Sequence, residues 1–276
     1  MAMRRSWARR WLQRLLAAVP LAVVVLGAGP AWNLASGHAS LHGDWSTATR
    51  QPAGIAPDPT EVREAVVHVY AARAFSWRGA FGVHSWLAVK ETGADHWTTY
   101  QVIGWYVRRG GEAVVIRNEA PDRYWFGNRP ELLAELRGDG VDDIIERIDS
   151  AARRYPWNDS YSIWPGPNSN TFTAWIARQV PELRVDLPPT AVGKDWLGDG
   201  TLAARAPSGT GFQLSLFGVA GLLAAVEEGI EVNLLGLTVG IDPLDFAIKL
   251  PGIGRIGGGS SPARAGEALG TAEPSR

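Results

Sequence analysis

Two neighbouring stretches decide the fold: GVHSWLAVK at residues 82–90 and TTYQVIGWYVR at residues 98–108. Both are rich in β-branched and aromatic residues, a composition typical of strands. The polar turn ETGADH separates them, and this spacing suits an antiparallel hairpin with a longer loop. The stretches AVVHVYAAR at residues 65–73 and EAVVIRN at residues 112–118 have the same character. We therefore predict an antiparallel sheet of three strands, to which residues 112–118 add a fourth.

The hydrophobic period becomes helical after this sheet. Apolar residues recur on one face over residues 141–155, and aspartates near the start of this segment suit the positive end of a helix dipole. Residues 130–136 are a short helix candidate. A third helix is expected from about residue 170 to residue 180, where Pro181 stops it.

The C-terminal part returns to a β pattern. Residues 211–256 contain short apolar stretches with frequent glycines, as in a tight β-meander. Glu231 and Asn233 alternate with Ile230 and Val232, which predicts one wet and one dry face. The whole pattern predicts an α+β fold: an antiparallel sheet with packed helices, followed by a Gly-rich β-meander.

The N-terminus has the pattern of a signal anchor or a signal peptide. Residues 15–32 carry no charge and reach the lower limit for crossing a bilayer. All five basic residues before this run are arginines, and the positive-inside rule leaves them in the cytoplasm. We expect one N-terminal span in the inner membrane and a periplasmic body. The sequence leaves open whether residues 1–32 are cleaved.

The remaining boundaries follow from composition. Residues 33–60 are polar and proline-rich and are predicted to be a linker, and residues 257–276 a disordered tail. The folded domain is expected over residues 61–256. Within it, residues 61–187 form the core and residues 188–256 the β extension.

Composition excludes several classes of function. The chain has 276 residues, a formal net charge of −1 and no cysteine, which argues against a nucleic-acid partner and excludes disulfides, thiolate metal sites and a cysteine nucleophile. The five histidines form no metal-binding spacing, and no phosphate-binding loop or dinucleotide fingerprint is present. We expect no cofactor and no metal.

Two segments have residue types that suit chemistry. His84 lies in a predicted strand, and the loop PGPNSNTF at residues 165–172 delivers Ser169 to the start of a helix. A side chain there faces free N–H groups and the positive end of the dipole, which suits a nucleophile or an oxyanion. A histidine on a strand could act as its base, oriented by Gln101 or Tyr100 on the neighbouring strand.

Structural interpretations stand beside these functional ones. A polar residue before a helix, here Asn168, Ser169 or Asn170, is most often an N-cap, and a strand histidine is most often structural. Lys194, Asp195 and Asp199 lie in a Gly-rich loop that forms a turn or lines a cleft. Five tryptophans cluster around the candidate segments and either pack in the core or stack on a sugar or acyl chain: Trp77, Trp86, Trp105, Trp164 and Trp175.

Two resemblances add to this interpretation. The blocks HVYAARAFSWRGAFGVHSWLAVK, YQVIGWYVRRG, YSIWPGPNSNTFTAWI, PPTAVGKDWLGDG and PSGTGFQLSLFG resemble an uncharacterised bacterial family, domain-of-unknown-function family 3750. More distantly, the order of strand histidine, strand polar residue and helix start resembles the circularly permuted papain-like fold of the NlpC-type and lecithin retinol acyltransferase-like enzymes. That resemblance implies His84 as base, Gln101 or else Tyr100 as orienting residue, and Ser169 at a nucleophile position that normally holds cysteine.

Three functions stay open. The first is a Ser–His hydrolase or acyltransferase of the cell envelope, with Asn168, Asn170, Tyr100, Trp86 and Trp164 around its site. The second is a catalytically inactive papain-like domain that binds an envelope ligand, such as a peptidoglycan or lipid fragment. The third is a structural envelope protein whose apolar C-terminal part packs on a partner or on the membrane surface.

Overall fold

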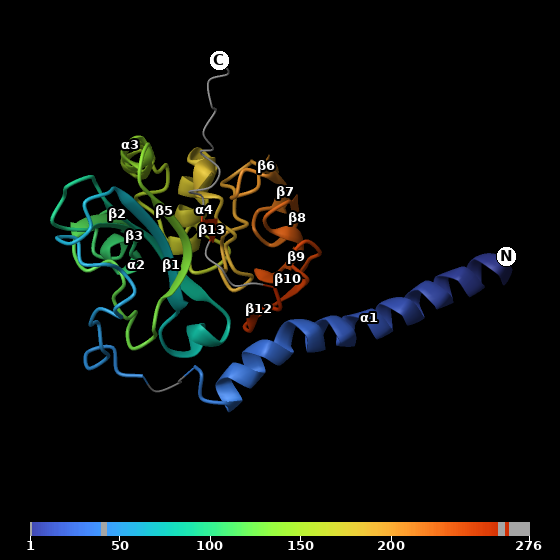
Figure 1. Cartoon of the computed structure of the whole chain (residues 1–276). Helices are drawn as coiled ribbons and strands as arrows, with labels where there is room; N and C mark the ends of the chain where they lie inside the picture. Colours follow the sequence, from blue (N-terminus) through green and yellow to red (C-terminus); the bar gives the residue numbers. More distant parts are fainter. Residues whose placement is uncertain (1, 40–42, 259–262, 265–276) are drawn as a thin grey trace, which may run out of the picture.

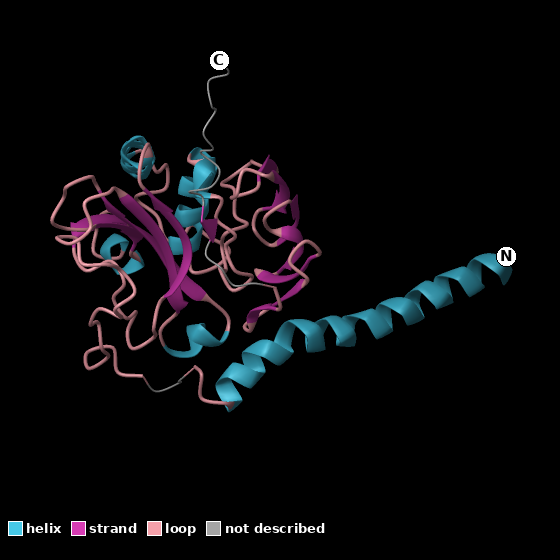
Figure 2. Cartoon of the chain, in the orientation of Figure 1, coloured by secondary structure: helices cyan, strands magenta, loops and turns pink. Residues whose placement is uncertain are grey.

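The computed structural model describes residues 2–39, 43–258 and 263–264. It contains two separate sheets of mainly antiparallel strands, with helices between and around them (Figures 1 and 2). The predicted α+β class is therefore confirmed. The first sheet has the order β13-β5-β1-β2-β3-β4, and only its short β13–β5 pair is parallel. Its strands are β1 (Val66–Arg73), β2 (Val83–Lys90), β3 (Thr98–Val102), β4 (Val114–Asn118), β5 (Glu131–Arg137) and β13 (Ala263–Arg264).

Strand β1 lies inside the first sheet, between β5 and β2, and both of its faces are covered. Val67 and Val69 belong to a large core cluster on one side, whereas Val66 and Tyr70 belong to a smaller cluster on the other. Continuous burial of this kind fits a β-branched strand with neighbours on both edges. The predicted strands at residues 65–73, 82–90 and 112–118 are thus confirmed within a residue or two.

The helices cover the face of the first sheet that holds the larger cluster. Helix α3 (Val141–Arg153) buries the apolar stripe expected from its spacing, and α4 (Ser169–Gln179) packs on β2 and β3. Figure 2 shows α4 between the two sheets. Three short helical segments complete this part: α2 (Gly104–Val107), η1 (Ser76–Ala80) and η2 (Pro181–Leu183).

Two sequence predictions in this region are wrong. Residues 130–136 form strand β5 instead of a helix, because Ala134 and Leu136 alternate into the core while the backbone pairs with β1. A segment this short has little helical stability of its own, so the available strand partner decides its structure. The strand predicted over residues 98–108 ends at Val102, and Gly104 then begins α2 directly beneath the Tyr161 ring.

The second sheet is a sequential meander with the order β12-β11-β10-β9-β8-β7-β6, as predicted for residues 211–256. Its alternation of wet and dry faces is also present, but Glu231 and Asn233 are buried whereas Ile230 and Val232 are exposed. The strands are β6 (Ala203–Arg205), β7 (Gly211–Leu216), β8 (Ala220–Ala225), β9 (Gly229–Leu234), β10 (Leu237–Asp242), β11 (Ala247–Leu250) and β12 (Gly254–Ile256).

The N-terminal region consists of one long helix and an ordered return to the body. Helix α1 (Ala2–Ala35) extends away from the body, and Ala18–Ala35 is long and apolar enough to cross a membrane (Figure 1). The later part of the predicted linker is packed on the body: Tyr124 donates its N–H to Gln51, and Asp122 accepts N–H bonds from Ile55 and Ala56. The predicted tail lies outside the described residues from 259 onward, except 263–264.

Candidate functional site

The start of α4 is built by Asn168, which acts as its N-cap. The Asn168 Oδ1 accepts N–H bonds from Asn170 (2.9 Å) and Thr171 (3.2 Å), and the Thr171 hydroxyl completes a capping box. The Asn168 Nδ2 donates to the carbonyls of Ile163 (3.0 Å) and Val192 (3.1 Å). The capping interpretation of Asn168 is confirmed, and its amide has structural partners on both ends.

Asn170 joins the helix start to the sheet. Its Nδ2 donates to the carbonyls of Val83 (3.0 Å) and Val192 (2.8 Å). The Ser85 hydroxyl is within 2.9 Å of both Asn170 Oδ1 and Thr173 Oγ1. The side chain of β2 that meets the helix start is therefore that of Ser85, which the sequence analysis did not single out.

His84 points to the opposite face of the first sheet. Neighbouring residues of a strand alternate between faces, and Ser85 faces α4. The His84 ring stacks on Trp125, with centroids 3.6 Å apart and planes 8° apart. The strand itself thus separates the His84 ring from the end of α4 that holds Ser169. The predicted Ser169–His84 pair is not assembled in this structure, because one residue of register decides the face.

The predicted contact between His84 and Gln101 is present. It begins a chain of polar contacts, the relay, which continues through Glu119 to Arg123. Gln101 Nε2 donates to Glu119 Oε1 (3.0 Å), so its Oε1 faces His84 Nε2 at 3.2 Å and accepts the ring N–H. Glu119 in turn binds Arg123 at 2.6 Å. Tyr100 lies on the other face and donates its hydroxyl to Asp149 (3.2 Å), so it does not orient His84.

Burial keeps the His84 imidazole neutral. Desolvation lowers its pKa to about 3, and the hydrogen bond to Gln101 offsets only part of this effect. A base for proton transfer works best with a pKa near the working pH. The environment of His84 therefore suits a neutral platform for Trp125 better than a general base.

This pKa predicts a pH dependence of stability. Below pH 6.5 the unfolded chain binds a proton on His84 that the folded chain does not, so the free energy of unfolding decreases as the pH falls from 6.5 toward 3. The loss from this residue is about 1.4 kcal/mol per pH unit. Urea unfolding between pH 7 and 5 should show a shallower decline for His84→Gln than for the wild type. Equal declines would contradict the buried neutral imidazole.

A cavity of about 190 Å³ lies on this same face of the sheet, beside the relay. Gln101 and Glu119 line it together with three arginines, Arg50, Arg117 and Arg123. One carboxylate against three guanidinium groups makes the lining electropositive. Its aromatic lining residues are Trp86, Trp105, Tyr106, Tyr124, Trp125 and Phe126.

The remaining predicted residues have separate places. Trp86 lines the cavity and donates its indole N–H to the Pro121 carbonyl (2.7 Å). Trp164 is half exposed and lies against Gly236, at a turn of the second sheet. The cavity and the helix start are thus two separate places, and the predicted residues are divided between them.

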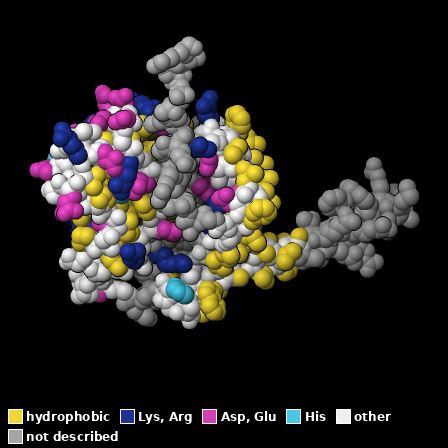
Figure 3. All heavy atoms as spheres, viewed as in Figure 1, with side chains coloured by type: hydrophobic (Ala, Val, Ile, Leu, Met, Phe, Trp, Pro, Cys, Tyr) yellow, Lys and Arg dark blue, Asp and Glu magenta, His cyan; other side chains and the backbone are white. Residues whose placement is uncertain are grey.

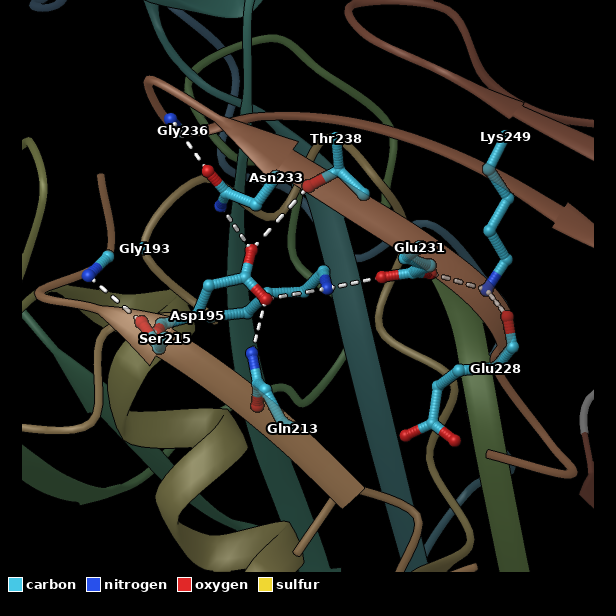
Figure 4. A network of polar contacts seen from close by, with 12 residues as sticks. Gly193, Asp195, Gln213, Ser215, Glu228, Glu231, Asn233, Gly236, Thr238 and Lys249 are labelled. Atoms are coloured by element: carbon cyan, nitrogen blue, oxygen red, sulfur yellow. Dashed lines mark hydrogen bonds and ion pairs between the residues drawn. The ribbon is translucent and has the colours of Figure 1, made fainter. Parts of the chain in front are cut away.

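Lys194 and Asp195 belong to neither a surface turn nor a cleft. Both are buried in a polar network between the domain core and the second sheet (Figure 4). Lys194 Nζ lies 2.5 Å from Glu231, whose other oxygen lies 2.7 Å from Lys249 Nζ. Asn233 Nδ2 donates to Asp195 at 2.5 Å. Burial lowers the pKa of Lys194, but the two carboxylates outweigh that effect and hold it above its usual value.

Comparison with known families identifies the domain. The family described as "Protein of unknown function (DUF3750)" matches residues 64–196. Residues 64–196 are a domain of this family. The DUF3750 match includes strands β1 to β5 of the first sheet, the relay, α4 and the Lys194–Asp195 pair, and it ends before the second sheet. No curated protein and no solved structure matches the chain. The papain-like resemblance therefore stays an expectation.

Proposed function

We propose that this DUF3750 protein is a membrane-anchored binding protein of the cell envelope, and that its cavity takes one ring of an anionic saccharide. The observation that carries the proposal is the combination of stacked aromatic rings with an arginine-rich rim in one cavity. Aromatic faces pack against the apolar face of a sugar ring, and guanidinium groups pair with carboxylates. A cavity of about 190 Å³ is small for a ligand site, which favours a single ring.

The aromatic part of the site is held rigid by stacking. Trp125 packs against His84 on one side and lies 6.3 Å from Trp105 with nearly parallel planes. Phe126 meets Trp125 edge to face at 4.9 Å. Side chains that are already fixed lose little entropy when a ligand binds, so this arrangement favours binding.

The charged part supports an anionic ligand. Arg123 is paired with Glu119, whereas the Arg117 guanidinium bonds to the neutral Tyr106 hydroxyl at 2.8 Å. The Arg50 guanidinium lies over the Phe126 ring, 4.4 Å from its centroid. Arg117 and Arg50 therefore bring positive charge without a carboxylate partner among the contacts of the described residues, and an anionic ligand would supply one.

The membrane side of the proposal rests on α1. Residues Ala18–Ala35 are apolar enough to span a bilayer, and the arginines precede them. The positive-inside rule then leaves the arginines in the cytoplasm and the body in the periplasm. A periplasmic site would have peptidoglycan fragments within reach.

The test is binding of N-acetylmuramic acid, which carries a carboxylate, against neutral N-acetylglucosamine. The full chain in detergent micelles should bind the acid saturably in calorimetry and bind the neutral sugar more weakly. Trp125→Ala should weaken binding about tenfold, equivalent to ~1.4 kcal/mol. Trp77→Ala is the matched control because Trp77 is exposed and does not line the cavity.

Two results would contradict this proposal. One is equal affinity for both sugars in the wild type, or no saturable binding of either. The other is labelling of the wild type by a serine-reactive fluorophosphonate that Ser169→Ala abolishes, which would instead support the hydrolase alternative.

A further inference from the structure

The second sheet is apolar on the face that points away from the protein. Its outward side chains follow one another across the strands by register, starting with Phe212 opposite Ala224, Ala224 opposite Ile230, and Ile230 opposite Ile241. A parallel row pairs Leu214 with Leu222 and Leu222 with Val232. Exposed members of this face include Phe212, Leu214, Leu222, Val232, Ile241 and Ile248. A contiguous apolar patch on this scale marks a contact surface.

The inward face of the same sheet is polar. Gln213, Glu231 and Lys249 are buried in the network that connects the sheet to the DUF3750 domain. The sheet is thus inverted relative to a soluble protein, in which apolar side chains are inside and charged ones are outside. Because the exposed face is apolar and the buried face is polar, we expect the exposed face to contact an apolar environment.

The turns of the second sheet also indicate an apolar environment. Phe217 and Leu235 each precede a glycine and adopt positive φ angles of 53° and 56°. Turns of this kind prefer asparagine, aspartate or glycine at that position. Phe246 also has a positive φ and is 89% exposed. Bulky apolar side chains at these tips are unfavourable in water and favourable in lipid.

Helix α1 is attached to the edge of this sheet. Asn33 Nδ2 donates to the carbonyls of Gly252 (2.6 Å) and Ala80 (3.1 Å). A Cβ on Gly29 would lie 2.0 Å from the Pro251 carbonyl oxygen, so the helix and the β11–β12 turn are in direct contact. The sheet is therefore fixed to the end of the segment that can span a membrane.

We propose that the outward face of the second sheet lies against the lipid bilayer into which α1 inserts. Figure 3 shows hydrophobic side chains gathered on the side formed by this sheet and continuing onto α1. In Figure 1 the N-terminal half of α1 extends toward the side that this sheet occupies. The C-terminal residues 259–276, GSSPARAGEALGTAEPSR, are too polar and small to cover such a face. The proposal does not depend on the ligand of the cavity.

The absence of cysteine makes a direct test available, because a single introduced cysteine takes a label at one place. The full-length variants Val232→Cys and Ile248→Cys are labelled with the polarity-sensitive fluorophore NBD. They are reconstituted in vesicles of phosphatidylethanolamine and phosphatidylglycerol at a ratio of about 3:1. Val23→Cys in α1 is the control for a lipid environment, and Glu112→Cys, exposed near the first sheet, is the control for water. Thermal unfolding checks that each labelled variant is folded.

The expected result is a blue-shifted emission at positions 232 and 248, like that at position 23. Lipids with a doxyl quencher on the acyl chain should reduce these three signals at least twofold and leave position 112 unchanged. Emission at 232 and 248 like that at 112 would overturn the proposal. A blue shift that lipid quenchers do not affect, and that disappears on dilution of protein in lipid, would overturn it too and indicate self-association.

Discussion

Replacing Glu231 by alanine is expected to reduce the free energy of unfolding by about 3–5 kcal/mol. The Glu231 carboxylate is buried and bonds to two buried ammonium groups, Lys194 at 2.5 Å and Lys249 at 2.7 Å. Asp195 and Asp186 are the remaining acidic partners of these two lysines. Without Glu231 each ammonium group keeps only one aspartate partner, and in a region that excludes water it cannot replace the lost bond with a bond to solvent.

The matched control is Glu227→Ala, which removes the same side chain from a half-exposed pair with Arg184. Surface pairs of this kind contribute about 0–1 kcal/mol, so this variant should unfold almost as the wild type does in urea. Glu231→Gln, which keeps the shape and loses the charge, should fall between the two. If Glu231→Ala cost no more than Glu227→Ala, the network would be solvated and would not hold the second sheet on the domain.

Local patterns in the sequence predict where most helices and strands lie. They do not predict which face of a strand is buried. The helix at residues 141–153 is predictable from the helical spacing of its own apolar residues, because any neighbour that covers this one side stabilises it. Residues 131–137 form a strand because β1 pairs with them, and that partner lies about 65 positions earlier. In β9 the alternation was visible, but which face is inside depends on Lys194 and Lys249, both remote in sequence.

The candidate site was likewise predictable only in part. The contact between His84 and Gln101 was predictable, since both were expected on neighbouring strands and alternation offered one of two partners. The face of His84 was not predictable, because a shift of one residue would have pointed it at Ser169. Glu119 and Trp125 come from the segment after β4, which sequence reasoning passed over. Its run RYWF at residues 123–126 was the available signal.

Asn168→Ala is expected to reduce the free energy of unfolding by about 2–4 kcal/mol. The variant loses the cap of α4, which is worth about 0.5–2 kcal/mol. It also leaves the carbonyls of Ile163 and Val192 without the donor that Asn168 Nδ2 provides, at a further cost of about 1–3 kcal/mol in a buried place. Val192 O retains the Asn170 amide at 2.8 Å, so the lower part of this range applies to it.

Asn168→Ser separates the two contributions, because serine caps a helix about as well as asparagine but cannot reach both carbonyls. We expect it to recover about half of the loss, as measured by urea unfolding. A different outcome, in which Asn168→Ala unfolds like the wild type but alters ligand binding or labelling at Ser169, would mean that this asparagine serves a site at the helix start. We expect the loss of stability instead, because both ends of the Asn168 amide already have hydrogen-bond partners within the fold.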